Sequence, residues 1–472
     1  MYKSVIGLEV HIELKTRTKI FCSCPTDFGG EPNTHVCPVC LGLPGSLPVL
    51  NRRVLQYAVT AGLALGCEIT PAISFDRKNY FYPDLPRGYQ ISQLYTPFAK
   101  NGGMTLSCGK TVRIHEIHME DDAGKLIHDG KNSFIDCNRC GVPLIEIVTE
   151  PDLSSGEEVV EFLSTLKGML EYTGISDGRI QEGSMRVDVN LSVHREGEPL
   201  GQRTEMKNLS SFRSVVRAIE YERERQIEVL RSGGAITPET RRFDEKDGKT
   251  YFMREKESAG QYRYFPEPDI PPVHITEELI SSLRDALPEF ALPRALRYEE
   301  DYNLTHDDAI TLTSTRSLAD LFEDTVKLSG DIKETKYLLL GEVLYLMGKR
   351  NVPLEGLHLT AERLSPLVKA LSSGRINRTS AKELLALICT PEGLELDEYI
   401  SSHGYEQTSD EDAIREVVKR VIADNPETLS QYLAGRTKVF GFFVGQSMKA
   451  LSGKADPELI NKIIIKELEI KE

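Results

Sequence analysis

The stretch I-G-L-E-V-H-I-E-L, residues 6–14, alternates apolar residues with polar or small ones. A period of two is typical of a β-strand with one buried face, because successive side chains of a strand point to opposite sides. Two carboxylates and an imidazole share the polar face: Glu9, His11 and Glu13. We therefore expect a half-buried sheet that carries ionisable groups on its polar side.

Two later segments repeat this pattern and predict further strands with acidic groups on one face. In residues 114–120, Glu116, His118 and Glu120 alternate with apolar positions. In residues 142–150, Glu146 lies among apolar neighbours on its own face. An uncompensated carboxylate there would cost on the order of several kcal/mol, so Glu146 indicates a nearby cation or hydrogen-bond donors.

Convergence of Glu9, Glu120 and Glu146 would form a magnesium site, since Mg²⁺ prefers carboxylate oxygens together with water and substrate phosphates. An imidazole suits softer metals, so His11 is expected either as an outer partner or as a ligand for manganese. A second interpretation stays open from the pattern alone: all three segments are solvated faces of amphipathic strands.

A fourth regular strand is expected over residues 186–194. Arg186 beside Asp188 can orient a phosphate and its cation, because a guanidinium matches phosphate oxygens in bidentate fashion. Later, less regular segments contain three residues that would add positive charge to the same cavity: Lys207, Arg254 and Arg263. A solvated outer face is the competing interpretation for each of them.

Four cysteines, Cys22, Cys24, Cys37 and Cys40, form a C-x-C and a C-x-x-C pair. Thiolates at this spacing can close a tetrahedral shell around zinc, and the surrounding prolines and glycines leave a metal as the organiser of the loop. All four ligands would be used, so the predicted zinc is structural. The alternative is that these four are unconnected reduced thiols. A later C-x-x-C pair, Cys137 and Cys140, is interpreted as binding no metal.

The composition of the 472 residues limits the class of protein. Hydrophobic residues make up 40% and charged residues 27%, as in globular proteins, and no apolar run is long enough for a membrane span, so a cytoplasmic location without membrane contact is expected. Nine cysteines, an odd number, favour a reducing compartment. The net charge of −15 opposes indiscriminate binding to nucleic acid, which would need a local patch.

The chain changes character near residue 290. Strand patterns dominate before a proline-rich segment at residues 266–293, and helical patterns follow it. Two helices are expected within the first part, one capped by Ser154 or Ser155 and ended by Gly174, the other over residues 212–231. Neither a P-loop nor a G-x-S-x-G nucleophile motif is found, so use of ATP would require another architecture.

Several irregular motifs occur along nearly the whole chain. They are G-L-E-V-H at 7–11, V-C-P-V-C-L-G-L-P-G at 36–45, R-K-N-Y-F-Y-P-D-L-P-R-G-Y-Q-I-S at 77–92, G-V-P-L-I-E-I-V-T-E-P-D at 141–152, Y-R-Y-F-P-E-P-D at 262–269, V-G-Q-S-M-K at 444–449 and G-K-A-D-P at 453–457. In these motifs the chain resembles the B subunit of the bacterial and organellar aspartyl/glutamyl-tRNA amidotransferases.

The resemblance implies an α+β fold in three parts: a cradle-like antiparallel-sheet catalytic domain over residues 1–292, a helical domain over 293–400 and a small tRNA-binding helical tail over 401–472. It also implies a heterotrimer with an amidase (glutaminase) subunit and a small bridging subunit. ATP and magnesium would serve to phosphorylate the side-chain carboxylate of mischarged Glu-tRNA(Gln) or Asp-tRNA(Asn), and ammonia would then give the amide.

By the same resemblance, the magnesium site and its catalytic residues fall on His11, Glu120 and Glu146, with Glu9 nearby, and the zinc site falls on the four early cysteines. A tail segment without acidic residues contains four cations that can hold tRNA phosphates: Arg436, Lys438, Lys449 and Lys454. A non-catalytic, zinc-stabilised tRNA adaptor is the alternative function.

Overall fold

The computed structural model describes residues 1–472 except 256–258, 408–410, 452–454, 456 and 470–472. It consists of two units, Met1–Phe290 and Ala291–Glu472. Lys454 of the predicted basic tail segment lies outside the described residues. In the part of the chain that is described, no helix combines the length and the apolar character needed to cross a bilayer.

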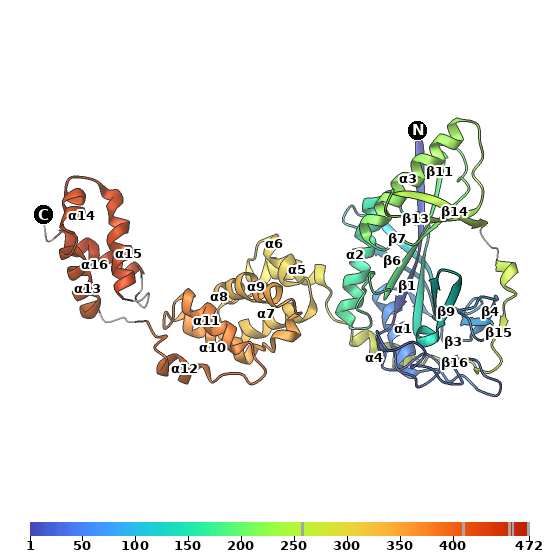
Figure 1. Ribbon diagram of the computed structural model, residues 1–472, viewed down its shortest axis with the longest axis horizontal. Helices are drawn as coiled ribbons and strands as arrows, with labels where there is room; N and C mark the ends of the chain where they lie inside the picture. Colours follow the sequence, from blue (N-terminus) through green and yellow to red (C-terminus); the bar gives the residue numbers. More distant parts are fainter. Residues whose placement is uncertain (256–258, 408–410, 452–454, 456, 470–472) are drawn as a thin grey trace. The chain divides into compact units, whose positions relative to one another are not determined.

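A nine-stranded sheet forms the framework of the first unit (Figure 1). Its strands, in spatial order, are β14 (Lys249–Glu255), β13 (Glu239–Asp244), β12 (Thr204–Lys207), β11 (Met185–Arg195), β1 (Tyr2–Glu13), β10 (Pro143–Thr149), β7 (Thr111–Asp121), β6 (Ala99–Thr105) and β2 (Glu68–Ile69). All neighbours pair antiparallel except β12 and β13, which are parallel.

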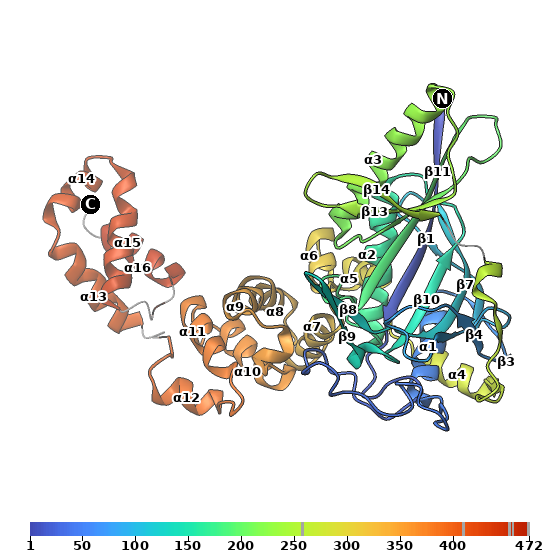
Figure 2. The same ribbon diagram turned by 45° about the vertical axis from the view of Figure 1, so that its right-hand side comes forward.

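The first strand lies in the middle of this sheet, between β10 and β11, and runs alongside β11 for most of its length (Figure 2). Its even-numbered residues from Ile6 to Ile12 are at most 1% exposed. They join one hydrophobic core with residues of four helices: α1 (Arg52–Ala64), α2 (Gly156–Thr173), α3 (Phe212–Arg231) and α4 (Glu277–Asp285). The polar face of β1 is therefore the opposite one, as the alternation predicts.

The two helices expected within the first unit are confirmed. Helix α2 begins after Ser155, whose side chain accepts a hydrogen bond from the Glu158 N–H, and ends at Gly174 with φ of 70°. The neighbouring Ser154 N–H donates to the Glu158 carboxylate, so the two serines share the capping functions. Helix α3 spans the expected residues and is capped by Ser211.

Short elements complete the first unit. They are a three-stranded sheet of β15 (Phe265–Pro266), β4 (Asp76–Asn79) and β5 (Tyr89–Ser92), a pair of β16 (Val273–His274) and β3 (Ala72–Ile73), a hairpin of β8 (Lys125–Asp129) and β9 (Asn132–Asp136), the turns η1 (Cys137–Arg139) and η2 (Ala259–Tyr262), and α4 (Glu277–Asp285).

The second unit is helical throughout its described residues. Its elements are α5 (Ala291–Tyr302), α6 (His306–Leu312), α7 (Arg316–Ser329), α8 (Ile332–Tyr337), the π-helical η3 (Leu338–Val343), α9 (Leu344–Arg350), η4 (Leu354–Leu357), α10 (Ala361–Ser372), α11 (Arg378–Ile388), α12 (Leu396–Ser402), α13 (Glu411–Ala423), α14 (Pro426–Leu433), η5 (Thr437–Val439), α15 (Phe440–Ala450) and α16 (Pro457–Glu469). They build two separate hydrophobic cores, one before residue 401 and one after residue 413. The expected α+β class, a sheet domain followed by helices, is confirmed.

Candidate metal centres on the polar face of the sheet

Strand register brings four ionisable side chains into one row. His11 on β1 lies opposite Glu146 on β10 and opposite Arg186 on β11. Glu146 in turn lies opposite His118 on β7. Residues paired across neighbouring strands project to the same side of a sheet, so the order Arg186, His11, Glu146 and His118 is a continuous line of charge on the polar face.

Glu120 completes a compact group with two members of this row. His11 Nε2 lies 3.4 Å from Glu120 Oε1 and 3.4 Å from Glu146 Oε2. One ligand atom of each of the three residues lies within 4.8 Å of the others. We call this group the His11 cluster. Two carboxylates and an imidazole at this spacing are a donor set that fits a divalent cation.

Protonation balances the charges of the His11 cluster when no metal is present. Burial disfavours the imidazolium of His11, but the charge and hydrogen bond of Glu146 outweigh burial and raise the pKa of His11 to about 9. Burial likewise opposes ionisation of Glu146, yet the two histidines hold the pKa of this carboxyl well below its usual range. A proton on His11 therefore occupies the position that a cation would take.

His118 belongs to this site although the sequence assigned it no role. Its Nε2 lies 2.9 Å from Glu146 Oε2 and 3.8 Å from Glu120 Oε2. Its Nδ1 is buried and has no hydrogen-bond partner among the described residues. The signal was present in the sequence, since His118 shares a strand face with Glu120. An imidazole in contact with both carboxylates orients them, as outer partners of a metal do.

Glu9 lies in a second group rather than in the first. Its carboxylate lies within 4.8 Å of ligand atoms of Asp188 and Glu205. The expectation that Glu9 shares one shell with Glu120 and Glu146 thus differs from the geometry, because register places Glu9 opposite Asp188 and Val148. We call the group of Glu9, Asp188 and Glu205 the Glu9 cluster.

Lys207 is half-buried and packs against the Glu9 cluster. Its Nζ bonds to Asp188 and lies 3.3 Å from Glu205 Oε1. Burial alone would lower the pKa of Lys207, but the charges of Asp188 and Glu205 raise it above its usual value. Asn190 Nδ2 also donates to Glu9 Oε1 at 2.9 Å. Asp188 and Lys207, which the sequence suggested as phosphate contacts, therefore pair with each other.

Arg186 lies next to His11 and is held by the carboxylate of Asp122, the residue that follows β7. Its Nη2 bonds to Asp122 Oδ1 at 3.0 Å, while Arg139 Nη2 bonds to the other oxygen of Asp122 at 2.6 Å. Burial opposes ionisation of Asp122, but the two guanidinium groups hold its pKa below the usual range. The Arg186 side chain remains 43% exposed and presents charge to the polar face.

The other two predicted cations lie farther from the His11 cluster. Arg254 on β14 pairs with Thr240, which pairs with Glu205, so two strand steps separate Arg254 from the Glu9 cluster. Arg263 is exposed and lies 5.9 Å from the centre of the Phe81 ring, and its carbonyl accepts from Asn79. The structure therefore does not bring Arg263 into the row of residues around His11.

Two tyrosines border the His11 cluster and went unassigned in the sequence. Burial and the nearby charge of Glu120 raise the pKa values of Tyr80 and Tyr264 above the usual range. Tyr80 and Tyr262 pack edge to face, with ring centres 5.9 Å apart. Their segments, residues 77–92 and 262–269, come together through pairing of β4 with β15.

The four early cysteines come together in the loop after β1. Their four Sγ atoms all lie within 4.8 Å of one another, which is consistent with a zinc site. The fully buried Lys19 donates from Nζ to the His35 carbonyl at 2.7 Å and lies 3.7 Å from Cys40 Sγ. A hydrogen bond from Cys22 and the charge of Lys19 outweigh burial and lower the pKa of Cys40 to about 4.

Comparison with known proteins places these sites within recognised regions. A family model described as the GatB/GatE catalytic domain matches residues 4–281, and one described as the GatB domain matches residues 320–468. The chain is 48% identical over 470 residues to the B subunit of an aspartyl/glutamyl-tRNA(Asn/Gln) amidotransferase of Lachnoclostridium phytofermentans, with 98% of each chain covered. It is 49% identical to the protein of the same name of Caldicellulosiruptor saccharolyticus, with 99% of each covered.

Proposed function

Because the chain belongs to the family of aspartyl/glutamyl-tRNA(Asn/Gln) amidotransferase B subunits and carries its catalytic domain, we propose that it converts mischarged Glu-tRNA(Gln) or Asp-tRNA(Asn) to the amide form. In this proposal ATP phosphorylates the side-chain carboxylate, and ammonia then replaces the phosphate. An amidase subunit supplies the ammonia from glutamine, and a small bridging subunit completes the complex.

The observation that carries the proposal is the His11 cluster. Its two carboxylates, one buried and one half-buried, together with the imidazole fit magnesium, which we place on His11, Glu120 and Glu146. When bound, the cation would neutralise charge on the phosphates and on the attacking carboxylate. An unaided carboxylate is a poor acceptor of nucleophiles, whereas its mixed anhydride with phosphate loses phosphate readily to ammonia.

The surrounding residues support positioning and exclusion of water. Arg186, anchored on Asp122, is placed to hold phosphate oxygens next to His11. Tyr80 and Tyr264, whose pKa values are raised by burial and by the charge of Glu120, would help to exclude water from an activated acid. His118 keeps the Glu146 carboxylate oriented toward the cluster.

In the reaction that we propose, a substrate carboxylate oxygen forms a bond to the γ-phosphorus while the bond to ADP breaks. The nitrogen lone pair of ammonia then attacks the acyl carbon, and phosphate leaves with its bonding electrons. The nitrogen loses one proton to give the neutral amide. Neither step needs an oxidant or a reductant.

Replacement of Glu146 by glutamine tests this function. Glu146→Gln keeps the shape of the side chain but removes one negative charge of the cluster, so we expect amide formation on the tRNA to fall by at least ~100-fold. Glutamine hydrolysis by the partner subunit should largely remain. Glu150→Gln, at an exposed pair with His115 near the end of the same strand, is the matched control. Unchanged amide formation in Glu146→Gln would remove this residue from the mechanism.

A second measurement separates catalysis from an adaptor role. The assembled complex is incubated with ATP and mischarged tRNA but without an ammonia donor, and ADP is measured. We expect ADP formation that is lost in Glu146→Gln. ADP formation that is the same in the variant would support a tRNA adaptor that depends on a partner for phosphorylation.

A further inference from the structure

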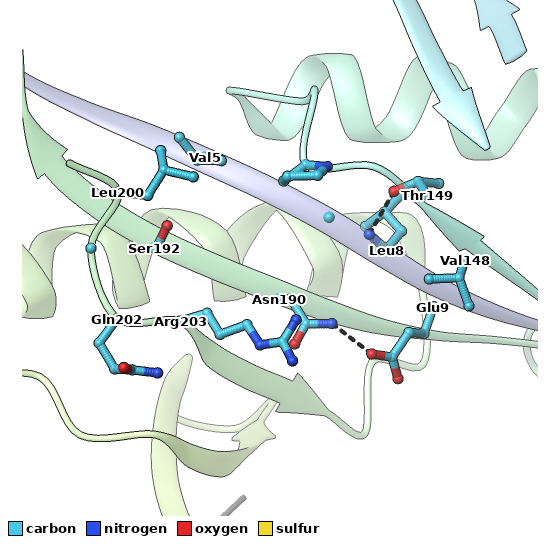
Figure 3. A pocket seen from close by; sticks show the side chains of 13 residues that line it. Val5, Leu8, Glu9, Val148, Thr149, Asn190, Ser192, Leu200, Gln202 and Arg203 are labelled. Atoms are coloured by element: carbon cyan, nitrogen blue, oxygen red, sulfur yellow. Dashed lines mark hydrogen bonds between the residues drawn. The ribbon is translucent and has the colours of Figure 1, made fainter. Parts of the chain in front are cut away.

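Lys19 differs from the other charged side chains inside the first unit in having no partner of fixed opposite charge. Lys207 bonds to Asp188, and the Glu9 carboxylate accepts a hydrogen bond from Asn190 (Figure 3). Lys19 is fully buried, yet among the described residues no carboxylate forms an ion pair with its ammonium group. A buried cation without compensation costs on the order of several kcal/mol, so the place of Lys19 indicates an anion of another kind.

The acceptors around Lys19 belong to the cysteine loop. Its Nζ donates to the His35 carbonyl at 2.7 Å and to Cys40 Sγ at 3.7 Å. The Cys37 N–H also donates to Cys40 Sγ, at 3.2 Å. A sulfur that accepts hydrogen bonds from an ammonium group and from a backbone amide is in surroundings that favour a thiolate. The group beside Lys19 that can carry negative charge is therefore the sulfur of Cys40.

A filled zinc site in this loop would be an anion, because one zinc ion neutralises only half of the charge of four thiolates. Burial of such an anion is costly unless donors or a cation compensate it. Lys19 provides a cation at the site. Arg87, which packs against Gly42 of the same loop, already bonds to Asp121. Lys19 is thus the cation beside the sulfurs whose charge no carboxylate of the described residues takes up.

Backbone and packing hold Lys19 in this place. Its N–H donates to the Cys24 carbonyl at 3.0 Å, and the next N–H, of Ile20, donates to the Gly141 carbonyl at 3.0 Å. A Cβ on Gly141 would lie 3.5 Å from Lys19 Cδ and 3.6 Å from Cys40 Cβ, so both side chains pack against this glycine. The stem of the lysine is confined by these contacts, and the fold itself directs the ammonium group at the sulfur.

We propose that Lys19 is the internal counter-cation of the zinc site. Its ammonium group compensates part of the negative charge of the thiolates through the hydrogen bond to Cys40, and zinc is bound more tightly as a result. Lys19 does not bind the metal and is a positioning residue of the site. The inference concerns the cysteine loop and does not depend on the reaction proposed for the His11 cluster.

The zinc affinity of Lys19→Met in the full chain tests the proposal, with a chromophoric chelator as competitor. Methionine keeps an unbranched side chain but removes the charge, so zinc affinity should fall by about tenfold or more. Lys15→Met, at an exposed lysine of the same segment, is the matched control and should stay within about twofold of wild type. Unchanged zinc affinity in Lys19→Met would overturn the proposal.

Cobalt(II) in place of zinc separates charge from packing. A cationic donor on a thiolate raises the energy of the sulfur-to-cobalt charge-transfer absorption, so this band should lie at longer wavelength in Lys19→Met than in wild type or in Lys15→Met. Lys19→Gln is neutral but its amide can still donate to the His35 carbonyl, and its band should shift in the same direction. A band that moves in neither variant would show that Lys19 serves packing alone.

Thermal unfolding with saturating zinc and with a chelator completes the test. A counter-cation stabilises the zinc-bound chain, so Lys19→Met should lose stability mainly when zinc is present. An equal loss with and without zinc would assign Lys19 to packing and overturn the proposal. If Lys19→Met fails to fold, Lys19→Gln decides by the same measurements. Absence of zinc binding by the wild-type chain also removes the counter-cation, but it leaves the proposed function, which Glu146→Gln tests.

Discussion

Single residues of the His11 cluster couple cation binding to pH. The pKa of His11 is raised to about 9, so at pH 7 its imidazole carries a proton that an incoming cation must displace. A lower pH favours the proton on His11 over the cation, and a higher pH favours the cation. We therefore expect the affinity for Mn²⁺ to rise up to ~10-fold per pH unit between pH 6.5 and 8.5, with a plateau beginning near the pKa of His11.

Electron paramagnetic resonance of free Mn²⁺ during titration measures this affinity. In His11→Asn the proton of His11 is absent, so the pH dependence should become shallower, with His118 as the remaining imidazole beside Glu146, while weak binding by the two carboxylates remains. An affinity that does not change with pH in the wild-type chain would contradict a protonated His11 in the metal-free cluster.

Residue-level patterns in the sequence predicted the face of each side chain but not its partner. Alternation placed Glu9 and His11 together on the polar side of β1, as observed. The alternation gives the face of a side chain but not its neighbours. A residue two positions away on the same face lies ~7 Å farther along the strand and therefore contacts different side chains. Lys207 shows the same limit, because its contact with Asp188 depends on the pairing of β11 with β12.

At the scale of elements, the loop after β1 depends on its four thiols. Residues 14–50 contain little regular structure, and Ile20 and Phe21 are among the few side chains that anchor the loop to the core. We expect Cys40→Ser to reduce bound zinc by at least ~10-fold and to make this loop the first site of proteolysis, because a zinc ion held by the four thiols would supply much of the folding free energy of the loop.

Zinc content by atomic absorption and limited proteolysis check this expectation. Cys108→Ser, at an exposed thiol in a turn outside the cluster, is the matched control. Full zinc content in Cys40→Ser would show that the thiols do not act as one site. The spacing of these cysteines sufficed to predict their proximity, whereas the buried Lys19 beside them had no recognisable signal in the sequence.

At the scale of the whole molecule, the helical unit contains two hydrophobic cores that share no residue. One includes Tyr298 and Leu385, the other Val418 and Phe443. We expect deletion of residues 411–472 to remove one calorimetric unfolding transition and to leave the others within ~2 °C, because few apolar contacts are lost elsewhere.

The same deletion tests the basic tail segment. Arg436, Lys438 and Lys449 are exposed, so they are free to meet tRNA phosphates. We expect tRNA affinity to fall and its salt dependence to become shallower. In the calorimetric experiment on the same deletion, a shift of the remaining unfolding transitions by more than ~5 °C would contradict the independence of the two cores. If the shortened chain and the full-length chain bind tRNA with equal affinity, both at low and at high salt, the basic tail segment does not take part in binding.

The general organisation was predictable because it depends on composition and periodicity, which are local. The change from strand patterns to helical patterns near residue 290 coincides with the boundary between the two units. The order of the nine strands was not predictable, since the parallel pair β12 and β13 and the central place of β1 are set by packing between distant segments.

The central place of β1 also has a consequence for synthesis on the ribosome. Its partners β10 and β11 begin only at Pro143 and Met185, so the first strand leaves the exit tunnel long before either exists. During that interval the side chains of Ile6, Leu8 and Val10, which are buried in the folded protein, are exposed to solvent. A nascent chain with exposed apolar side chains is prone to aggregate and is a substrate for chaperones. Translation must therefore pass Arg195 before the amino-terminal residues gain their native neighbours.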